Sequence, residues 1–254
     1  MPVRRDPKTR TEVTPFKRGF TKTHARDGIA AEAISNHLKS AAPTNFGEPS
    51  GNPWQRPALD AAFFAQNACE VARQLVGAWL LFAPPNGPRR WAWVLETEAY
   101  RGDDPACHAF TTAKKPDPHR RGAALFGPPG TAYVYLNYGV HWLLNVVAEP
   151  EGQVGAALIR ALEPIAGFEP HSQCNGPGKL TRALGIAGEL HGALLTAPPL
   201  WFALPERPPF EVAVSARIGI SKGTERPWRY FAAGHPGVSR GRPGKSPAKK
   251  RRPK

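Results

Sequence analysis

Two carboxylates and a tyrosine stand at alternate positions in the middle of the chain. Glu96, Glu98 and Tyr100 lie in the segment WAWVLETEAY. Because side chains alternate along a strand, the three share one face if this segment is a strand. Paired carboxylates can hydrolyse a glycosidic bond, with one activating water or attacking the sugar while another group assists departure. A carboxylate near a strand end is also often solvated or paired with arginine, so the pair alone does not decide between these readings.

Tyrosines form a second chemical feature some thirty residues further on. Tyr133 and Tyr135 are two apart and share a face of a predicted strand, where tyrosine is an ordinary residue with an apolar ring and a polar tip. Together with Tyr100, they could instead line a slot for a flat ligand such as a nucleobase. Tyr138 lies at the turn between two predicted strands, where an exposed ring could insert between stacked bases.

The other polar candidates indicate a functional site only in combination with these groups. His108 alone is typical of a loop histidine with a satisfied hydrogen bond, and Asn145 is typical of a hydrogen-bonded core amide. Arg160 falls on a later predicted strand. A basic cluster after His108 is usually a solvated feature but could grip phosphates beside the slot. It consists of Lys114, Lys115, Arg120 and Arg121.

Apolar segments with the character of strands surround these residues. WLLF at 79–82 and WAWVLETEAY at 91–100 flank Asn86-Gly87, a dipeptide that favours a tight hairpin turn. Further strands, rich in aromatic and β-branched residues or alternating in polarity, are predicted at 131–137, 139–148, 154–162 and 211–220. The first three of these are expected to be adjacent and antiparallel.

Two short helices are predicted between the strands. Asn67-Ala-Cys-Glu70 has the spacing of a helix start and Gly77 fits an end, which predicts a helix over 68–75. Asn175-Gly-Pro177 supplies a cap with proline in the first turn, and LTRAL before Gly185 completes a second helix. Together the elements predict an α+β single domain, in which short helices flank a curved, mainly antiparallel sheet.

Most of the positive charge lies at the two ends of the chain. The formal net charge of +14 divides into +5 over residues 1–57, +1 over 58–234 and +8 over 235–254. The polar N-terminal part and the low-complexity C-terminal arm predict disordered basic extensions of a folded domain at 58–234. The arm is expected to attract a polyanion, because each Lys or Arg that neutralises a phosphate releases a counterion. A merely solubilising tail is the alternative.

The cysteine and hydropathy patterns indicate the cellular compartment in which the protein is expected. Cys69, Cys107 and Cys174 are far apart and lack the paired spacing of a zinc or redox site, so free thiols in a reducing compartment are expected. No apolar run has the length of a signal peptide or a membrane span. We expect a soluble, intracellular protein.

The order and spacing of the motifs resemble the 3-methyladenine (alkyladenine) DNA glycosylase family. Over residues 60–234 the chain contains, in the family's order, ETEAY, a histidine, FGPPG-x-x-YVY-x-x-YG, an asparagine seven residues later, RALEP, GPGKL and ARIGI. The resemblance implies a monofunctional glycosylase of base excision repair. It also implies an intracellular, DNA-associated monomer that uses neither metal nor cofactor. Such an enzyme flips alkylated purines out of double-stranded DNA, hydrolyses the N-glycosidic bond and leaves an abasic site. Etheno and deaminated purines are open alternatives as substrates.

The resemblance also implies a role for each matching residue. Glu98 matches the general base that activates the attacking water, and Arg160 matches the residue that helps to hold this water. Tyr100, His108 and Tyr135 match the pocket that sandwiches the extruded base.

Three more residues match family positions that contact DNA or the base. Tyr138 matches the wedge that fills the gap left by the base, and Asn145 matches the residue that rejects guanine by crowding its exocyclic amine. Lys179 in GPGKL is a candidate for a backbone contact. The chain departs from the family pattern at Gly122, where members commonly have Asn, and at Leu125, where they commonly have Met.

The expected chemistry suits a single catalytic carboxylate. An alkylated purine such as 3-methyladenine already carries positive charge and leaves readily, whereas a neutral lesion needs a proton from solvent or from a pocket group. A different class of protein is the alternative, a non-catalytic nucleic-acid-binding module that uses an aromatic sheet face and basic tails. A carboxylate in the slot disfavours that alternative, because it repels phosphate.

Overall fold

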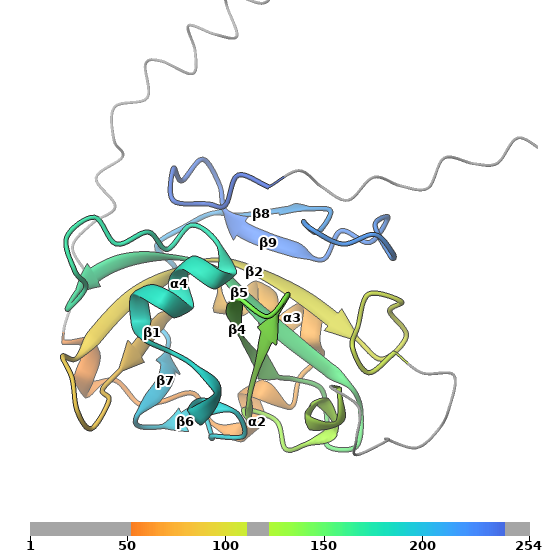
Figure 1. Ribbon diagram of the computed structural model, residues 1–254, viewed down its shortest axis with the longest axis horizontal. Coiled ribbons are helices and arrows are strands. Elements are labelled where there is room, and N and C mark those ends of the chain that lie inside the picture. The colour runs from red at the N-terminus through yellow and green to blue at the C-terminus, as the bar shows by residue number, and fades with distance from the viewer. Residues whose placement is uncertain (1–51, 111–121, 242–254) are drawn as a thin grey trace, which may run out of the picture. The chain divides into compact units, whose positions relative to one another are not determined.

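A computed structural model describes residues 52–110 and 122–241 (Figure 1). Within these residues, nine strands form one curled antiparallel sheet, and the helices are short. This architecture confirms the α+β fold with a curved antiparallel sheet that the sequence predicts. No helix in the described part of the chain is long and apolar enough to cross a membrane.

The helices lie before the first strand and between later strands along the chain: η1 (Pro53–Gln55), α2 (Ala61–Phe64), α3 (Ala68–Leu75), η2 (Ala123–Phe126), α4 (Pro177–Leu184) and η3 (Gly188–Leu190). The strands are β1 (Trp79–Phe82), β2 (Arg90–Arg101), β3 (Ala132–Asn137), β4 (His141–Val147), β5 (Gly155–Ala166), β6 (Thr196–Ala197), β7 (Leu200–Ala203), β8 (Val212–Ser215) and β9 (Arg229–Ala232). Along the sheet the order is β3-β4-β5-β2-β1-β7-β6, while β9 pairs with both β2 and β8.

Strand β2 takes part in three of the sheet's strand pairings, more than any other strand. One edge pairs with β5 along nearly its whole length. The other edge pairs first with β1, over Arg90–Trp93, and then with β9, over Glu96–Glu98. The pairing with β5 shifts register around Glu96, where β1 has ended and β9 begins. Such irregularities re-aim side chains and are common beside active sites.

Helix α3 covers one face of β2 and confirms the predicted boundaries. The side chain of Asn67 caps the helix by accepting a hydrogen bond from the N–H of Cys69 at 2.9 Å. The hydroxyl of Thr97 donates to the carbonyl of Ala72 at 2.6 Å, which directs Thr97 towards the helix. Because side chains alternate, the neighbours Glu96 and Glu98 face away from α3. The buried helix face consists of Ala68, Val71, Ala72 and Leu75.

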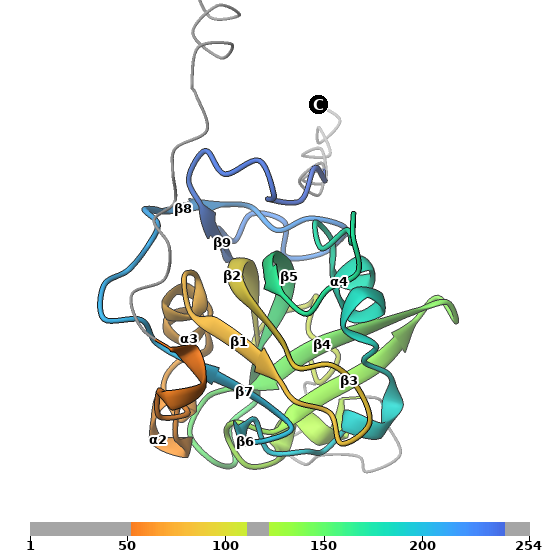
Figure 2. The same ribbon diagram turned by 90° about the vertical axis from the view of Figure 1, so that its left-hand side faces the viewer.

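Helix α4 packs against β4 and β5, across the sheet from α3 (Figure 2). The predicted cap is wrong by one residue, because Gly176 occupies the N-cap position and no side chain caps the first turn. Asn175 instead accepts a hydrogen bond from the Nζ of Lys179 at 3.0 Å. Gly185 closes the helix with a φ of 72°, as its position predicts.

The core strand predicted at 211–220 is wrong in length and burial. Strand β8 covers only Val212–Ser215, is partly exposed and pairs only with β9. The chain then forms a loop that brings Arg217 and Ile218, both buried, next to β2. No pattern in the sequence predicts β9, because four residues carry too little alternation to distinguish a strand from a loop.

The described chain extends seven residues beyond the boundary expected at residue 234. His235 and Ser239 are buried there, and the backbone N–H of Ser239 donates to Glu96 at 2.7 Å. Residues 235–241 therefore pack onto the sheet, next to the carboxylates of β2.

Candidate active site

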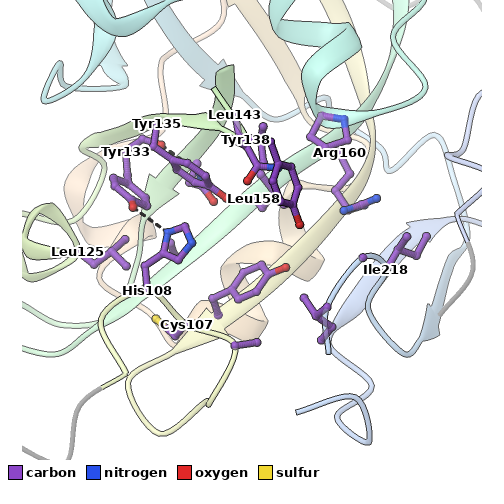
Figure 3. A pocket seen from close by; sticks show the side chains of 18 residues that line it. Cys107, His108, Leu125, Tyr133, Tyr135, Tyr138, Leu143, Leu158, Arg160 and Ile218 are labelled. Atoms are coloured by element: carbon purple, nitrogen blue, oxygen red, sulfur yellow. Dashed lines mark hydrogen bonds between the residues drawn. The ribbon is translucent and has the colours of Figure 1, made fainter. Parts of the chain in front are cut away.

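A cavity of about 440 Å³ opens beside strands β3, β4 and β5 (Figure 3). His108 and the two tyrosines 133 and 135 gather at one end, and Arg160 and Ile218 lie towards the other. The remaining wall comes from the end of β2, η2 and the loop after β8. A cavity of this size is typical of sites for small, flat ligands.

Glu98 lies behind the wall of this cavity and is fully buried. Its Oε2 accepts hydrogen bonds from the hydroxyl of Tyr100 at 2.8 Å and from Nη1 of Arg160 at 3.2 Å. Its Oε1 accepts from the backbone N–H of Ile218 at 2.6 Å. All three donors line the cavity, so one layer of side chains separates the carboxylate from a ligand. Burial raises the pKa of Glu98, and the three donors act in the opposite direction.

Glu96 has a different set of partners and is held rigidly. Its Oε1 accepts from Nε of Arg160 at 3.1 Å, from Nε of Arg229 at 2.6 Å and from the hydroxyl of Ser239 at 2.8 Å. Its Oε2 accepts from the N–H of Ser239 at 2.7 Å. These bonds use most of the capacity of a carboxylate, which has about four acceptor sites. Of the carboxylate pair seen in the sequence, Glu98 is therefore the member available to the cavity.

Arg160 joins the two carboxylates and forms part of the cavity wall. Burial acts to lower the pKa of Arg160, but Glu98 and Glu96 outweigh this effect and raise it. The guanidinium therefore stays charged and is oriented by Glu96 towards Glu98.

The aromatic wall contains a hydrogen-bonded histidine. Nδ1 of His108 and the hydroxyl of Tyr133 lie 2.9 Å apart. The His108 ring packs edge-to-face with Tyr135 at 4.7 Å between centroids. Tyr133 is 3% exposed and supports His108, whereas Tyr135 is only half-buried. Tyr133 thus positions His108, whereas Tyr135 leaves part of its ring exposed.

Tyr100 lies between two charged groups of opposite sign. Its hydroxyl contacts Glu98, and the guanidinium of Arg217 lies 4.6 Å from the centre of its ring. Burial and the nearby Glu98 carboxylate hold the pKa of Tyr100 well above its usual range. The phenol therefore remains a hydrogen-bond donor to Glu98.

Asn145 sits in the wall between β3 and β5. It is 4% exposed, and its side-chain amide donates to the carbonyl of Tyr133 at 3.0 Å. Its position in the cavity wall fits both expectations from the sequence, the hydrogen-bonded core amide and the group that contacts a bound ring.

Tyr138 projects from the hairpin between β3 and β4 and is 88% exposed. Its φ is 49°, and Gly139 follows with a φ of 72°. A bulky residue with positive φ is uncommon, and such strain is found mostly at functional sites. The hairpin places the ring at the cavity mouth, because Tyr138 also lines the cavity.

Arg217 has a central part in the site that the sequence did not reveal. Its fully buried side chain pairs with Asp104 and donates to the carbonyls of Ala99 and Gly223 at 2.9 and 3.1 Å. These bonds join the end of β2, the loop with His108 and the loop with Ile218. The ARIGI motif contains this arginine, but a motif alone does not show which segments it connects.

Of the remaining predicted contacts, Lys179 alone belongs to the described residues, and it does not line the cavity. Lys179 is exposed on α4. Lys114, Lys115, Arg120 and Arg121 lie outside the described residues. Within 52–110 and 122–241, no three His, Cys, Asp or Glu side chains are grouped as metal ligands.

The site is a cavity lined by aromatic side chains, with a buried carboxylate directly behind its wall. The chain belongs to the methylpurine-DNA glycosylase family, whose sequence profile matches residues 62–236. It is therefore a DNA glycosylase, a hydrolase of the N-glycosidic bond.

Similar proteins support this assignment over most of the chain. A protein of Salinibacter ruber named "Putative 3-methyladenine DNA glycosylase" is 50% identical over 197 residues, which cover 71% of this chain and 96% of that protein. Proteins with the same name from Rhodopseudomonas palustris and Chlorobaculum parvum are 44% and 40% identical, over 70% and 76% of this chain and 86% and 95% of their own lengths.

Gly122, one of the two departures from the family pattern, has a steric reason in this chain. A Cβ at this position would lie 2.6 Å from the backbone nitrogen of Ala109 and 2.7 Å from the carbonyl of His108. Only glycine lets η2 approach the segment that carries His108. Leu125, the second departure, is 2% exposed and packs in a small cluster with Cys107 at the cavity wall.

The Gly122→Ala variant is expected to displace the backbone at His108 and to weaken binding of a duplex that contains a methylated purine about tenfold, or ~1.4 kcal/mol. Equilibrium titration with labelled duplex measures the change. Gly87→Ala is the matched control, since its Cβ would meet only a Pro84 side-chain atom at 3.3 Å. Equal affinities of the two variants would contradict the steric role of Gly122.

Proposed function

We propose that this protein excises alkylated purines of the 3-methyladenine type from double-stranded DNA as a monofunctional glycosylase. One observation carries the proposal. A fully buried carboxylate with a raised pKa lies directly behind an aromatic-lined cavity, and its three hydrogen-bond donors all belong to the cavity wall. The names of the similar proteins point to the same class of substrate.

Recognition in this proposal depends on base flipping. The damaged base leaves the helix, a step that costs a few kcal/mol and costs less for weakly paired bases, and enters the cavity between Tyr100, His108 and Tyr135. Stacking on aromatic faces favours cationic, electron-poor rings. Tyr138 inserts into the duplex where the base was, which fits its exposure and its position at the cavity mouth. Asn145 crowds the exocyclic amine of guanine and rejects that base.

Glu98 acts as the general base in the hydrolysis. Its carboxylate takes a proton from a water molecule that Arg160 helps to hold, and the water oxygen bonds to C1′ of the sugar. The C1′–N bond breaks, and its electron pair stays with the departing base and neutralises the positive charge of the alkylated ring. Three hydrogen bonds occupy Glu98, so about one of its acceptor sites remains for water.

Arg160 and Tyr100 also control whether Glu98, the general base, is ionised. Both donate to Oε2 of Glu98 and favour its ionised form, against the effect of burial. Glu98 is thus kept as a carboxylate whose raised pKa makes it a stronger base than an exposed glutamate.

The test of this function is the release of free base from a methylated duplex. Chromatography is expected to show free alkylated purine, while the DNA strand stays intact until alkali cleaves it at the abasic site. Strand cleavage before alkali would contradict the monofunctional assignment. Failure to release any alkylated, etheno or deaminated base, with retained binding, would instead indicate a non-catalytic nucleic-acid-binding module.

The excision rate is expected to depend on pH through Glu98. Only the carboxylate accepts a proton, so the rate falls as the pH drops through the raised pKa of Glu98. Tyr100→Phe keeps the ring but removes a donor that favours the carboxylate, which raises this pKa further. The acid limb of the single-turnover pH profile should therefore move to higher pH.

Tyr135→Phe is the matched control for this prediction, because Tyr135 does not contact Glu98 in any hydrogen bond of the site. Its acid limb should coincide with that of the unmodified protein even if the rate changes. An unshifted limb in Tyr100→Phe would show that another group sets the pH dependence.

A further inference from the structure

The ion pair between Asp104 and Arg217 is fully buried next to residues of the cavity wall, but it does not line the cavity. We propose that this pair is a positioning group of the active site, which holds donors of Glu98 in place and thereby governs the ionisation of this carboxyl. The inference rests on the proposed function, because Glu98 is the proposed general base. Arg217 acts through Tyr100 and Ile218, and Asp104 anchors Arg217 and offsets part of its charge.

Arg217 holds two of the three hydrogen-bond donors of Glu98. Its guanidinium lies 4.6 Å from the centre of the Tyr100 ring, whose hydroxyl donates to Glu98 at 2.8 Å. Its Nη1 donates to the carbonyl of Ala99 at 2.9 Å, which fixes the backbone immediately before Tyr100. The residue that follows Arg217 is Ile218, whose N–H donates to Glu98 at 2.6 Å. A displacement of Arg217 would therefore move both donors.

Asp104 connects Arg217 to the loop that carries His108 into the aromatic wall. Its two carboxylate oxygens accept from the two Nη atoms of Arg217, with 2.9 Å between Nη2 and Oδ1. The same Oδ1 accepts from the N–H of Ala106 at 3.1 Å, and the carbonyl of Asp104 accepts from the N–H of Cys107 at 2.9 Å. Ala106, Cys107 and His108 line the cavity. One ion pair thus joins the aromatic wall to the donors of the general base.

The surroundings of the pair keep it in one position. The carbonyl of Gly223 accepts from Nη2 of Arg217 at 3.1 Å. A Cβ at Gly223 would lie 2.5 Å from Oδ1 of Asp104 and 3.0 Å from Nη2 of Arg217, so only glycine allows this approach. The ring of Trp228 lies 5.2 Å from the guanidinium. Backbone and aromatic contacts therefore fix both members of the pair.

A purely structural joint does not need charges at this place. Removing two opposite charges from water is unfavourable, and well-packed apolar side chains of similar volume often stabilise a fold as much or more. Nε of Arg217 is also buried without a hydrogen-bond partner among the described residues, which adds to the cost. The arrangement favours a role in which the charge of Arg217 itself acts on a neighbour.

The charge of Arg217 favours the carboxylate form of Glu98. Burial and the Glu98 carboxylate raise the pKa of Tyr100, and the Arg217 cation acts in the opposite direction. The cation thereby makes the Tyr100 hydroxyl a stronger donor, and a stronger donor favours the ionised acceptor. Asp104 offsets part of this effect, and α3 covers the opposite face of β2. The other charged groups around Glu98 come from β2, β5 and β9 and are Glu96, Arg160 and Arg229.

Opposite effects of the two partners provide the first test. Arg217→Gln removes the cation, so Glu98 should titrate at higher pH than in the unmodified protein. Asp104→Asn keeps the size of the side chain and an acceptor oxygen but leaves the cation without its counter-charge, so Glu98 should titrate at lower pH. Carboxyl carbon NMR of the protein without DNA measures both shifts, and the Glu98 signal is identified by its loss in Glu98→Gln.

A pair with only a structural role would shift the titration of Glu98 in the same direction in both variants, because either change would loosen the donors. That result, or a titration that does not move, overturns the proposal. If Arg217→Gln does not fold, Asp104→Asn decides alone, since only the charge of Arg217 accounts for a shift to lower pH.

Arg217→Lys and Asp103→Asn are the matched controls. Arg217→Lys keeps the charge without the planar fork, so its Glu98 titration should lie closer to that of the unmodified protein than in Arg217→Gln. Asp103→Asn removes an exposed carboxylate of the same loop, which pairs with Arg226 at 3.0 Å. This variant should leave the titration unchanged, and a shift as large as in Asp104→Asn would contradict the specific role of the buried pair.

The route through Tyr100 is tested in a Tyr100→Phe background. There, Asp104→Asn should shift the titration of Glu98 less than it does in the unmodified protein, because the hydroxyl that transmits the effect is absent. An equal shift would show that Arg217 acts on Glu98 without Tyr100 and would contradict the proposed route.

These titrations do not depend on base release. In single-turnover excision, the acid limbs of the pH profiles should move in the same directions as the titrations of Glu98. A protein that shows the opposite shifts but releases no base would retain the positioning pair and refute the glycosylase proposal for alkylated purines. A protein that releases base while the titration of Glu98 stays unmoved in both variants would refute the positioning pair alone.

Discussion

The burial of Glu96 and Glu98 beside the guanidinium of Arg160 is the interaction on which the rest of this structure depends. Removing charged groups from water costs several kcal/mol for each ion, and the cost is recovered only if every charge finds partners. The partners come from distant parts of the chain: Arg229 on β9, the N–H of Ile218 and the anchored Ser239. The C-terminal third must therefore return across β2 before the two carboxylates can be buried.

The same network gives Glu96 and Glu98 different environments, although the two side chains are chemically identical. Glu96 is surrounded by donors and holds Arg160, Arg229 and Ser239 in place. Glu98 has fewer donors, a raised pKa and a position behind the cavity wall, which suits the proposed general base. Since Arg160 contacts both carboxylates, a change at Glu96 is transmitted to Glu98 without direct contact between the two.

Local sequence signals predicted the elements near the site better than the contacts within it. Helix α3, the pairing of β1 with β2 and the adjacent strands β3, β4 and β5 follow from caps and alternation, which act over a few residues. The tight turn expected at Asn86-Gly87 is wrong, because residues 83–89 separate the two strands and neither Asn86 nor Gly87 has a positive φ. The register shift at Glu96 and the return of β9 depend on long-range pairing, so no short pattern contains them.

Within the site, too, the sequence indicated features along one segment but not the contacts between distant segments. The alternation of Glu98 and Tyr100 was visible in the sequence, and family resemblance supplied expected roles for His108 and Asn145. That Tyr133 supports His108, and that Arg217 ties the end of β2 to two loops, could not be predicted, because these contacts join segments up to 118 residues apart. The large positive charge was also uninformative about the site, since most of it lies in the two ends of the chain.

Single-turnover excision by Glu98→Gln tests the central claim most directly. The substitution keeps the size of the side chain and removes its ability to accept a proton. The variant should bind a duplex with a methylated purine nearly as tightly as the unmodified protein, which also shows that its fold is intact. Its rate of base release should fall by roughly 10²–10⁴-fold, the usual contribution of a general base. An unchanged rate on the saturated complex would contradict the assignment of Glu98 as the group that activates water.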